Sequence, residues 1–95
     1  RGSGARRASY VYSYSEDIQK DLHRTYPHSA FLGTQPGIAA LERVLTAFSL
    51  HNPIIGYCQG LNFICGACLE VLHVEADAFQ VFAHLIDNRD ATYTQ

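Results

Sequence analysis

The feature that most constrains this chain is an apolar run from Leu61 to Leu72. Within it only Asn62 and Glu70 are strongly polar. So apolar a segment predicts a helix inside the protein, with other elements covering it on most sides. The residues that lead into the run are, in contrast, mostly polar or glycine: Asn52, Pro53, Gly56, Gln59, Gly60 and Asn62.

This polar entrance points to a ligand of negative charge. We expect Gln59 to lie on or near the first turn of the buried helix. Helix N-termini carry unpaired N–H groups and partial positive charge, which suits anions such as phosphate. A glutamine amide both donates and accepts hydrogen bonds, so it can orient a water molecule while touching a phosphoryl oxygen.

Length and composition limit the classes of protein to consider. Ninety-five residues make one domain at most, and because Met is absent even from the first position we expect a piece of a longer protein. With 47% hydrophobic and 17% charged residues the chain should form a globular core. A net charge of −2 argues against general nucleic-acid binding. No apolar run is long enough to cross a bilayer. The chain has three cysteines, and an odd number fits free thiols in a reducing compartment better than a set of disulfides.

The first half of the chain predicts an arm followed by two helices. Residues 1–14 should form a flexible or extended arm before a domain that covers 15–95. Ser13 or Ser15 can cap a helix that runs to about Arg24, with Ile18, Leu22, Thr25 and Asp21 on one face. Pro36, capped by Thr34 or Gln35, should begin a second helix that ends near Leu50.

The second half predicts two further helices. Pro53 should break the chain before the buried helix. Asp77 can cap a last helix, whose apolar face would hold Phe79, Phe82, Leu85 and Ile86. Residues 88–95 read as a loop. No convincing strand or repeat is present, so the expected fold class is all-α with about four helices.

Two short motifs resemble the signatures of one protein family. Residues 18–25, Ile-Gln-Lys-Asp-Leu-His-Arg-Thr, match the Ile-x-x-Asp-x-x-Arg signature of TBC domains, which activate Rab GTPases. Residues 57–62, Tyr-Cys-Gln-Gly-Leu-Asn, match that family's Tyr-x-Gln signature and its flanking residues. The match covers about 15–86. Each motif alone is weak, but both in this order with an amphipathic helix between them are specific.

The resemblance implies a fold, a function and a set of site residues. The fold would be a partial multi-helix TBC-type (Rab-GAP) domain. The function would be acceleration of GTP hydrolysis on a GTP-bound Rab-family GTPase, with Arg24 as an arginine finger and Gln59 as a glutamine finger. Asp21, Tyr57, Gly60 and Asn62 would support them. The chain would need no metal or cofactor of its own, since the partner carries GTP and Mg²⁺.

Alternatives stay open for these residues. Arg24 could simply pair with Asp17 or Asp21, as arginines on helix surfaces usually do. The rival function is a Rab-binding or scaffolding helical module without catalysis. A zinc or redox site at Cys65 and Cys68 is disfavoured, because both lie inside the apolar run and not at a helix start. We expect a cytoplasmic protein that is recruited to membrane surfaces through its GTPase partner and acts in vesicle trafficking.

Overall fold

A computed structural model describes the backbone of residues 14–94 and the side chains of residues 14–87. A first helix is described from residue 14 to 22, and three more follow: α2 (Gln35–His51), α3 (Leu61–Leu72) and α4 (Glu75–Thr94). No strand occurs between residues 14 and 94, so the expected all-α class with about four helices is confirmed. The predicted arm, apart from Tyr14, lies outside the described residues.

Local sequence signals set the bounds of α2 and α3. The Thr34 side chain caps α2 by accepting a hydrogen bond from the Gly37 N–H, and Pro36 stands in the first turn as predicted. The apolar run and α3 have the same bounds. His73 ends α3 in the left-handed conformation, with φ 63°, and its N–H donates to the Leu69 carbonyl over 3.0 Å.

Two predictions about the last helix were wrong. The helix begins at Glu75, so Asp77 lies within its first turn and is not its cap. Residues 88–94, predicted as a loop, continue α4 to Thr94. Neither Gly nor Pro occurs between Glu75 and Thr94, so no local signal breaks the helix once it has formed. Carboxylates in the first turn also suit the positive end of the helix dipole.

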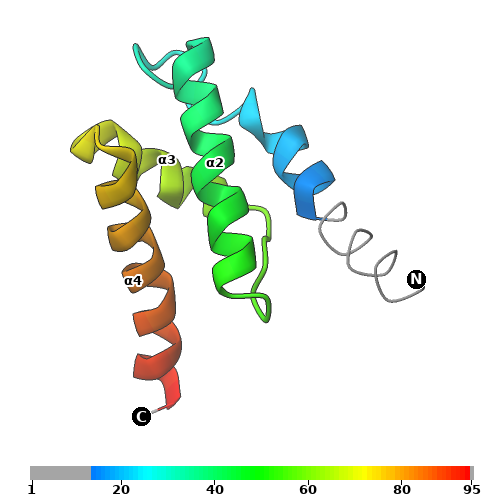
Figure 1. Cartoon of the computed structure of the whole chain (residues 1–95), viewed down its shortest axis with the longest axis vertical. Helices are drawn as coiled ribbons and strands as arrows, with labels where there is room; N and C mark the ends of the chain where they lie inside the picture. Colours follow the sequence, from blue (N-terminus) through cyan, green and yellow to red (C-terminus); the bar gives the residue numbers. More distant parts are fainter. Residues whose placement is uncertain (1–13, 95) are drawn as a thin grey trace.

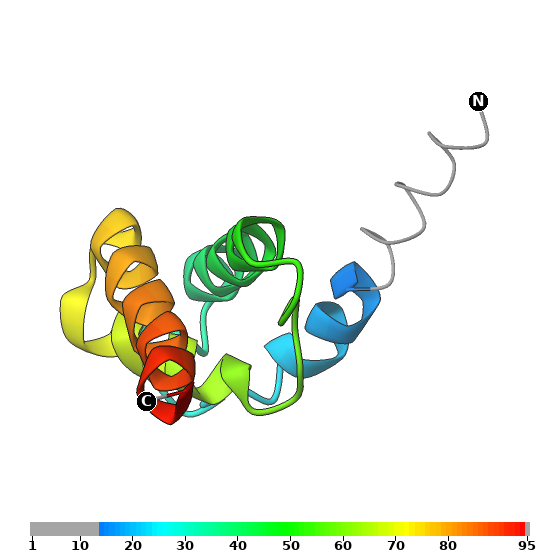
Figure 2. The same ribbon diagram turned by 90° about the horizontal axis from the view of Figure 1, so that it is seen from below.

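Helix α3 lies across the back of the molecule and packs against both α2 and α4 (Figure 1). Seen from below, the first helix and α4 stand on opposite sides of α2 (Figure 2). Phe48 of α2 and Phe82 of α4 meet edge to face in the core, with ring centroids 5.0 Å apart. The largest other fully buried apolar side chains are Ile18, Leu32, Leu41, Leu45, Leu69 and Cys65.

Most of α3 is covered by other elements, as predicted, but one face of the helix is open. Phe63 is 40% exposed and Val71 is 75% exposed, whereas Cys65 and Leu69 on the opposite face are buried. Beside this open face is an apolar groove of about 530 Å³ between α3 and α4. Its lining residues are Tyr26, Phe63, Ile64, Ala67, Cys68, Val71, Leu72, Val81 and Leu85.

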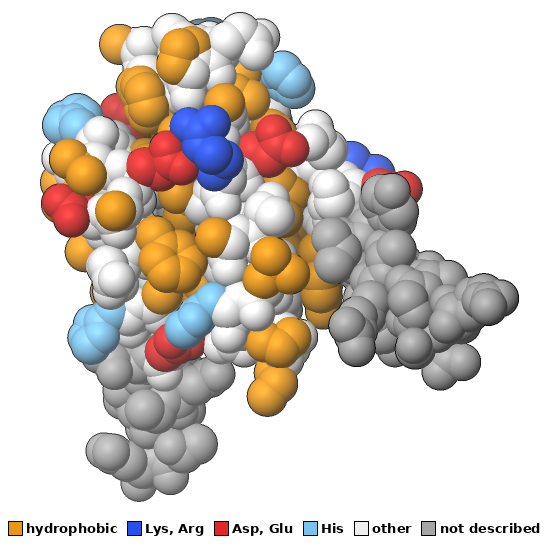
Figure 3. All heavy atoms as spheres, viewed as in Figure 1, with side chains coloured by type: hydrophobic (Ala, Val, Ile, Leu, Met, Phe, Trp, Pro, Cys, Tyr) orange, Lys and Arg blue, Asp and Glu red, His pale blue; other side chains and the backbone are white. Residues whose placement is uncertain are grey.

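The face that carries α2 has a mixed surface. Figure 3 shows acidic and basic side chains close together over α2, with hydrophobic side chains scattered around them. One such pair is Arg43 of α2 and Glu75 of α4, whose Nε and Oε2 atoms are 2.7 Å apart. None of the helices in the described part of the chain is long and apolar enough to span a membrane.

Candidate functional site

The two predicted finger residues line one pocket. Its volume is about 520 Å³. It is bordered by Arg24, two residues after the first helix ends, and by Gln59 from the turn before α3. Its complete lining is Asp17, Lys20, Asp21, Arg24, Tyr57, Cys58 and Gln59. Two carboxylates and two cations therefore surround the pocket, and the loop between α2 and α3 closes its other side.

Asp21 anchors the Arg24 side chain. Arg24 Nε donates to Asp21 Oδ1 over 2.8 Å, and Nη2 lies 2.6 Å from the same oxygen. The arginine side chain is 51% exposed, while the aspartate side chain is 6% exposed. Asp17 lines the pocket, but among the described residues only Asp21 forms an ion pair with Arg24. The guanidinium is thus tethered to Asp21, and the partly exposed arginine side chain lines the pocket.

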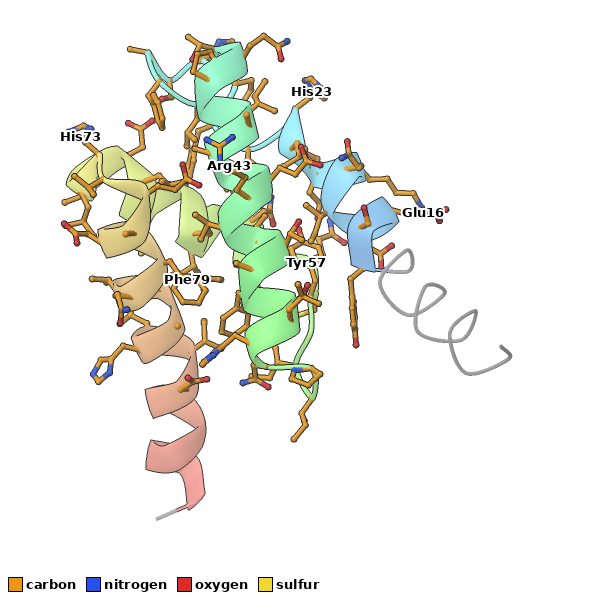
Figure 4. All side chains as sticks on the ribbon, in the orientation of Figure 1. Glu16, His23, Arg43, Tyr57, His73 and Phe79 are labelled. Atoms are coloured by element: carbon orange, nitrogen blue, oxygen red, sulfur yellow. The ribbon has the colours of Figure 1, made fainter. Side chains whose placement is uncertain are left out.

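Tyr57 holds the other oxygen of the same carboxylate. Its hydroxyl donates to Asp21 Oδ2, and both residues are buried. Figure 4 shows Tyr57 between the first helix and α2. Burial, and next the hydrogen bond to Asp21, raise the pKa of Tyr57 well above its ordinary value, so the hydroxyl stays protonated and remains a donor. Asp21 therefore joins the Arg24 segment to the Tyr57 segment.

Gly60 gives the Gln59 turn its shape. Helix α3 begins at Leu61 and Gly60 is its N-cap, so Gln59 lies just before the helix and not in its first turn. Gly60 has φ 111°, which a residue with a side chain rarely adopts, and a Cβ there would meet no atom within 4 Å. The glycine is needed for its backbone conformation. Gln59 is exposed, and no described residue hydrogen-bonds its amide.

A buried polar pair close in sequence to Arg24 and Gln59 completes the site. Asn62 Nδ2 donates to Thr25 Oγ1 over 2.8 Å, and both residues are fully buried. The sequence pattern put Thr25 on an apolar face and did not predict this contact. The signal that could have found it is a hydroxyl on a predicted apolar face, because a buried polar group needs a partner.

The cysteines divide into one exposed and two buried thiols. Cys58 is exposed beside the pocket, whereas Cys65 and Cys68 are buried in α3. Burial raises the pKa of Cys65 and of Cys68, which keeps both thiols protonated and unreactive. Within the described residues, no three His, Cys, Asp or Glu side chains group in a way that could hold a metal ion.

The pocket presents a fixed cation and an exposed amide at an open surface. A guanidinium is always charged, and its planar fork fits phosphate oxygens. An amide beside it can donate to an oxygen and accept from water. The arrangement can therefore contact a phosphoryl group brought by another molecule.

Comparisons with known proteins identify relatives of the chain. The Rab-GTPase-TBC domain family matches residues 5–95. Growth hormone-regulated TBC protein 6 of Caenorhabditis elegans is 41% identical over 78 residues, or 82% of this chain. TBC domain-containing protein C4G8.04 of Schizosaccharomyces pombe is 48% identical over 73 residues, or 75% of the chain. GTPase-activating protein GYP3 of Saccharomyces cerevisiae is 45% identical over 65 residues, or 61% of the chain.

The matches cover only part of each relative. They span 24% of the worm protein, 9% of the S. pombe protein and 10% of the S. cerevisiae protein. No solved structure matches the chain.

Proposed function

Because the chain belongs to the Rab-GTPase-TBC domain family, we propose that it stimulates GTP hydrolysis by a Rab-family small GTPase. Arg24 and Gln59 act in trans on the nucleotide of the GTP-bound partner, which brings GTP and Mg²⁺. The observation that carries the proposal is the shared pocket: two side chains 35 positions apart in the sequence border one open cavity of about 520 Å³.

Arg24 stabilises the charge that develops during hydrolysis. Phosphoryl transfer spreads negative charge over the γ-phosphoryl oxygens, and an arginine supplied in trans neutralises it. The bonds to Asp21 hold the guanidinium before the partner arrives, so less side-chain freedom is lost in the complex. The exposed half of the side chain is the part that reaches the phosphate.

Gln59 orients the attacking water. Its carbonyl oxygen accepts from the water while its NH₂ group donates to a phosphoryl oxygen. A glutamate there would put a negative charge beside phosphate, so the amide is the suitable group. The exposure of Gln59 and its lack of a bonding partner among the described residues support this role.

Single substitutions in the intact protein test the proposal. Hydrolysis is measured under single-turnover conditions against a panel of GTP-loaded Rab proteins. Arg24→Ala should lower the stimulated rate by about 10³–10⁵-fold, the value of an arginine finger. Gln59→Ala should lower it by about 10²–10³-fold, the usual loss of one transition-state donor. Binding to a GTP-locked Rab should change much less.

Arg43→Ala and Gln80→Ala are matched controls, because both residues are exposed and lie outside the pocket. Arg24→Lys should recover little activity, since an ammonium is a point charge and not a fork. Full stimulation by both Arg24→Ala and Gln59→Ala would refute the finger roles. A protein that binds GTP-loaded Rab but never stimulates hydrolysis would be the rival binding or scaffolding module.

A further inference from the structure

A chain of three directed hydrogen bonds runs from Gly60 to Asp21. The Gly60 N–H donates to Asn62 Oδ1 over 3.0 Å. Asn62 Nδ2 donates to Thr25 Oγ1 over 2.8 Å. The Thr25 hydroxyl donates to the Asp21 carbonyl over 2.5 Å. Because a backbone N–H can only donate, the Asn62 oxygen must face Gly60, and the direction of every other bond follows.

This chain of bonds joins the backbones that carry the two fingers. Gly60 directly follows Gln59, and Asp21 is three positions before Arg24. Tyr57 lies two residues before Gln59, and its hydroxyl donates a hydrogen bond to the Asp21 carboxylate. Tyr57, which precedes Cys58 and Gln59, is thus bonded directly to Asp21. Gly60, which follows them, is linked to Asp21 through Asn62 and Thr25.

Thr25 uses both branches of its side chain. A Cβ added at Gly66 would stand 3.0 Å from the Thr25 methyl carbon, so α3 approaches this methyl closely. The hydroxyl forms the hydrogen bonds to Asn62 and Asp21, and the methyl group packs against α3 at Gly66. The two parts can therefore be removed separately: Thr25→Val keeps the shape without the hydroxyl, and Thr25→Ser keeps the hydroxyl without the methyl.

We propose that Thr25 and Asn62 are positioning residues that fix the Gln59 turn relative to Arg24 for GTPase activation. The inference rests on the proposed function. Neither residue can touch the nucleotide, because both are fully buried. They act through Gly60 and Asp21. Misplacing a reacting group by about 1 Å can cost roughly 100-fold in rate, so a buried link of this kind controls activity without contacting the substrate.

The test compares the two Thr25 variants in the intact protein with a GTP-loaded Rab that responds to it. Thr25→Val should lower the maximal rate by about 10–100-fold. The concentration of half-maximal rate should stay within about twofold, because the binding surface is unchanged. Thr25→Ser should keep a maximal rate within about threefold of the unsubstituted protein. Asn62→Leu should resemble Thr25→Val, and the double variant should be no worse than either, since both break one chain of bonds.

Amide hydrogen exchange of the peptide that contains Gly60 provides a readout independent of activity. Exchange should be faster in Thr25→Val and unchanged in Thr25→Ser. A normal maximal rate in Thr25→Val, or an equal loss in both Thr25 variants, would overturn the inference. If the unsubstituted protein stimulates no Rab, the proposed function fails. Exchange then decides the positioning role: equal rates in Thr25→Val and the unsubstituted protein refute it, and faster exchange in the variant supports it.

Discussion

Replacing Tyr57 by Phe removes the hydroxyl of one of the two side chains that bond the Asp21 carboxylate. The tyrosine is 7% exposed and the aspartate 5% exposed, so water cannot readily replace the lost hydroxyl. The ring stays in place, which leaves little cavity. Hydrogen bonds to charged groups contribute about 1.5–3 kcal/mol, so we expect the free energy of unfolding to fall by about 2 kcal/mol.

For a domain of this size, about 2 kcal/mol corresponds to a melting temperature roughly 8–16 °C lower. Urea unfolding and a thermal scan of the intact protein measure both quantities. Tyr26→Phe is the matched control, because the Tyr26 hydroxyl bonds the Phe63 carbonyl over 3.3 Å at an exposed position. It should cost less than about 0.5 kcal/mol. Equal losses in the two variants would refute the argument that Asp21 depends on Tyr57.

Two further predictions concern the same segment. Since the pKa of Tyr57 is raised above its ordinary 10.0, the protonated hydroxyl adds stability that is present below pH 10 and is lost as pH rises further. The unsubstituted protein should therefore be more stable than Tyr57→Phe below about pH 10, and this difference in unfolding free energy should shrink at higher pH. Urea titrations at several pH values measure the difference, and a constant value would contradict the prediction. Gly60→Ala should cost about 1–3 kcal/mol in urea unfolding because φ is 111°, and an unchanged unfolding midpoint would show that the turn relaxes freely.

Local sequence signals were sufficient where they are strong. Thr34 and Pro36 predicted the start of α2, and the apolar run predicted both ends of α3. The same signals failed at the end of α4, where polar residues looked like a loop although nothing in them stops a helix. Hydrophobicity alone also could not show that α3 keeps one face open, because exposure depends on which elements pack against it.

The site was predictable as a set of residues but not as a set of contacts. Recognising two motifs suggested that Arg24 and Gln59 act together, and both border one pocket. The bonds that join their segments span 36 and 37 positions, and no local pattern encodes such pairings. A carboxylate on an apolar face, such as Asp21, needs hydrogen-bond partners when it is buried. Thr25 could have been argued in the same way.

The separation of Thr25 and Asn62 along the chain also sets an order of events during synthesis. The ribosome makes the arginine segment first and must add 37 more positions before Asn62 exists. At roughly 5–20 residues per second this takes about 2–7 s. A nascent chain in that interval carries the cation without the link, and until Gln59 is added it also lacks the amide. Premature release of such a chain would yield a product that lacks the second half of the site.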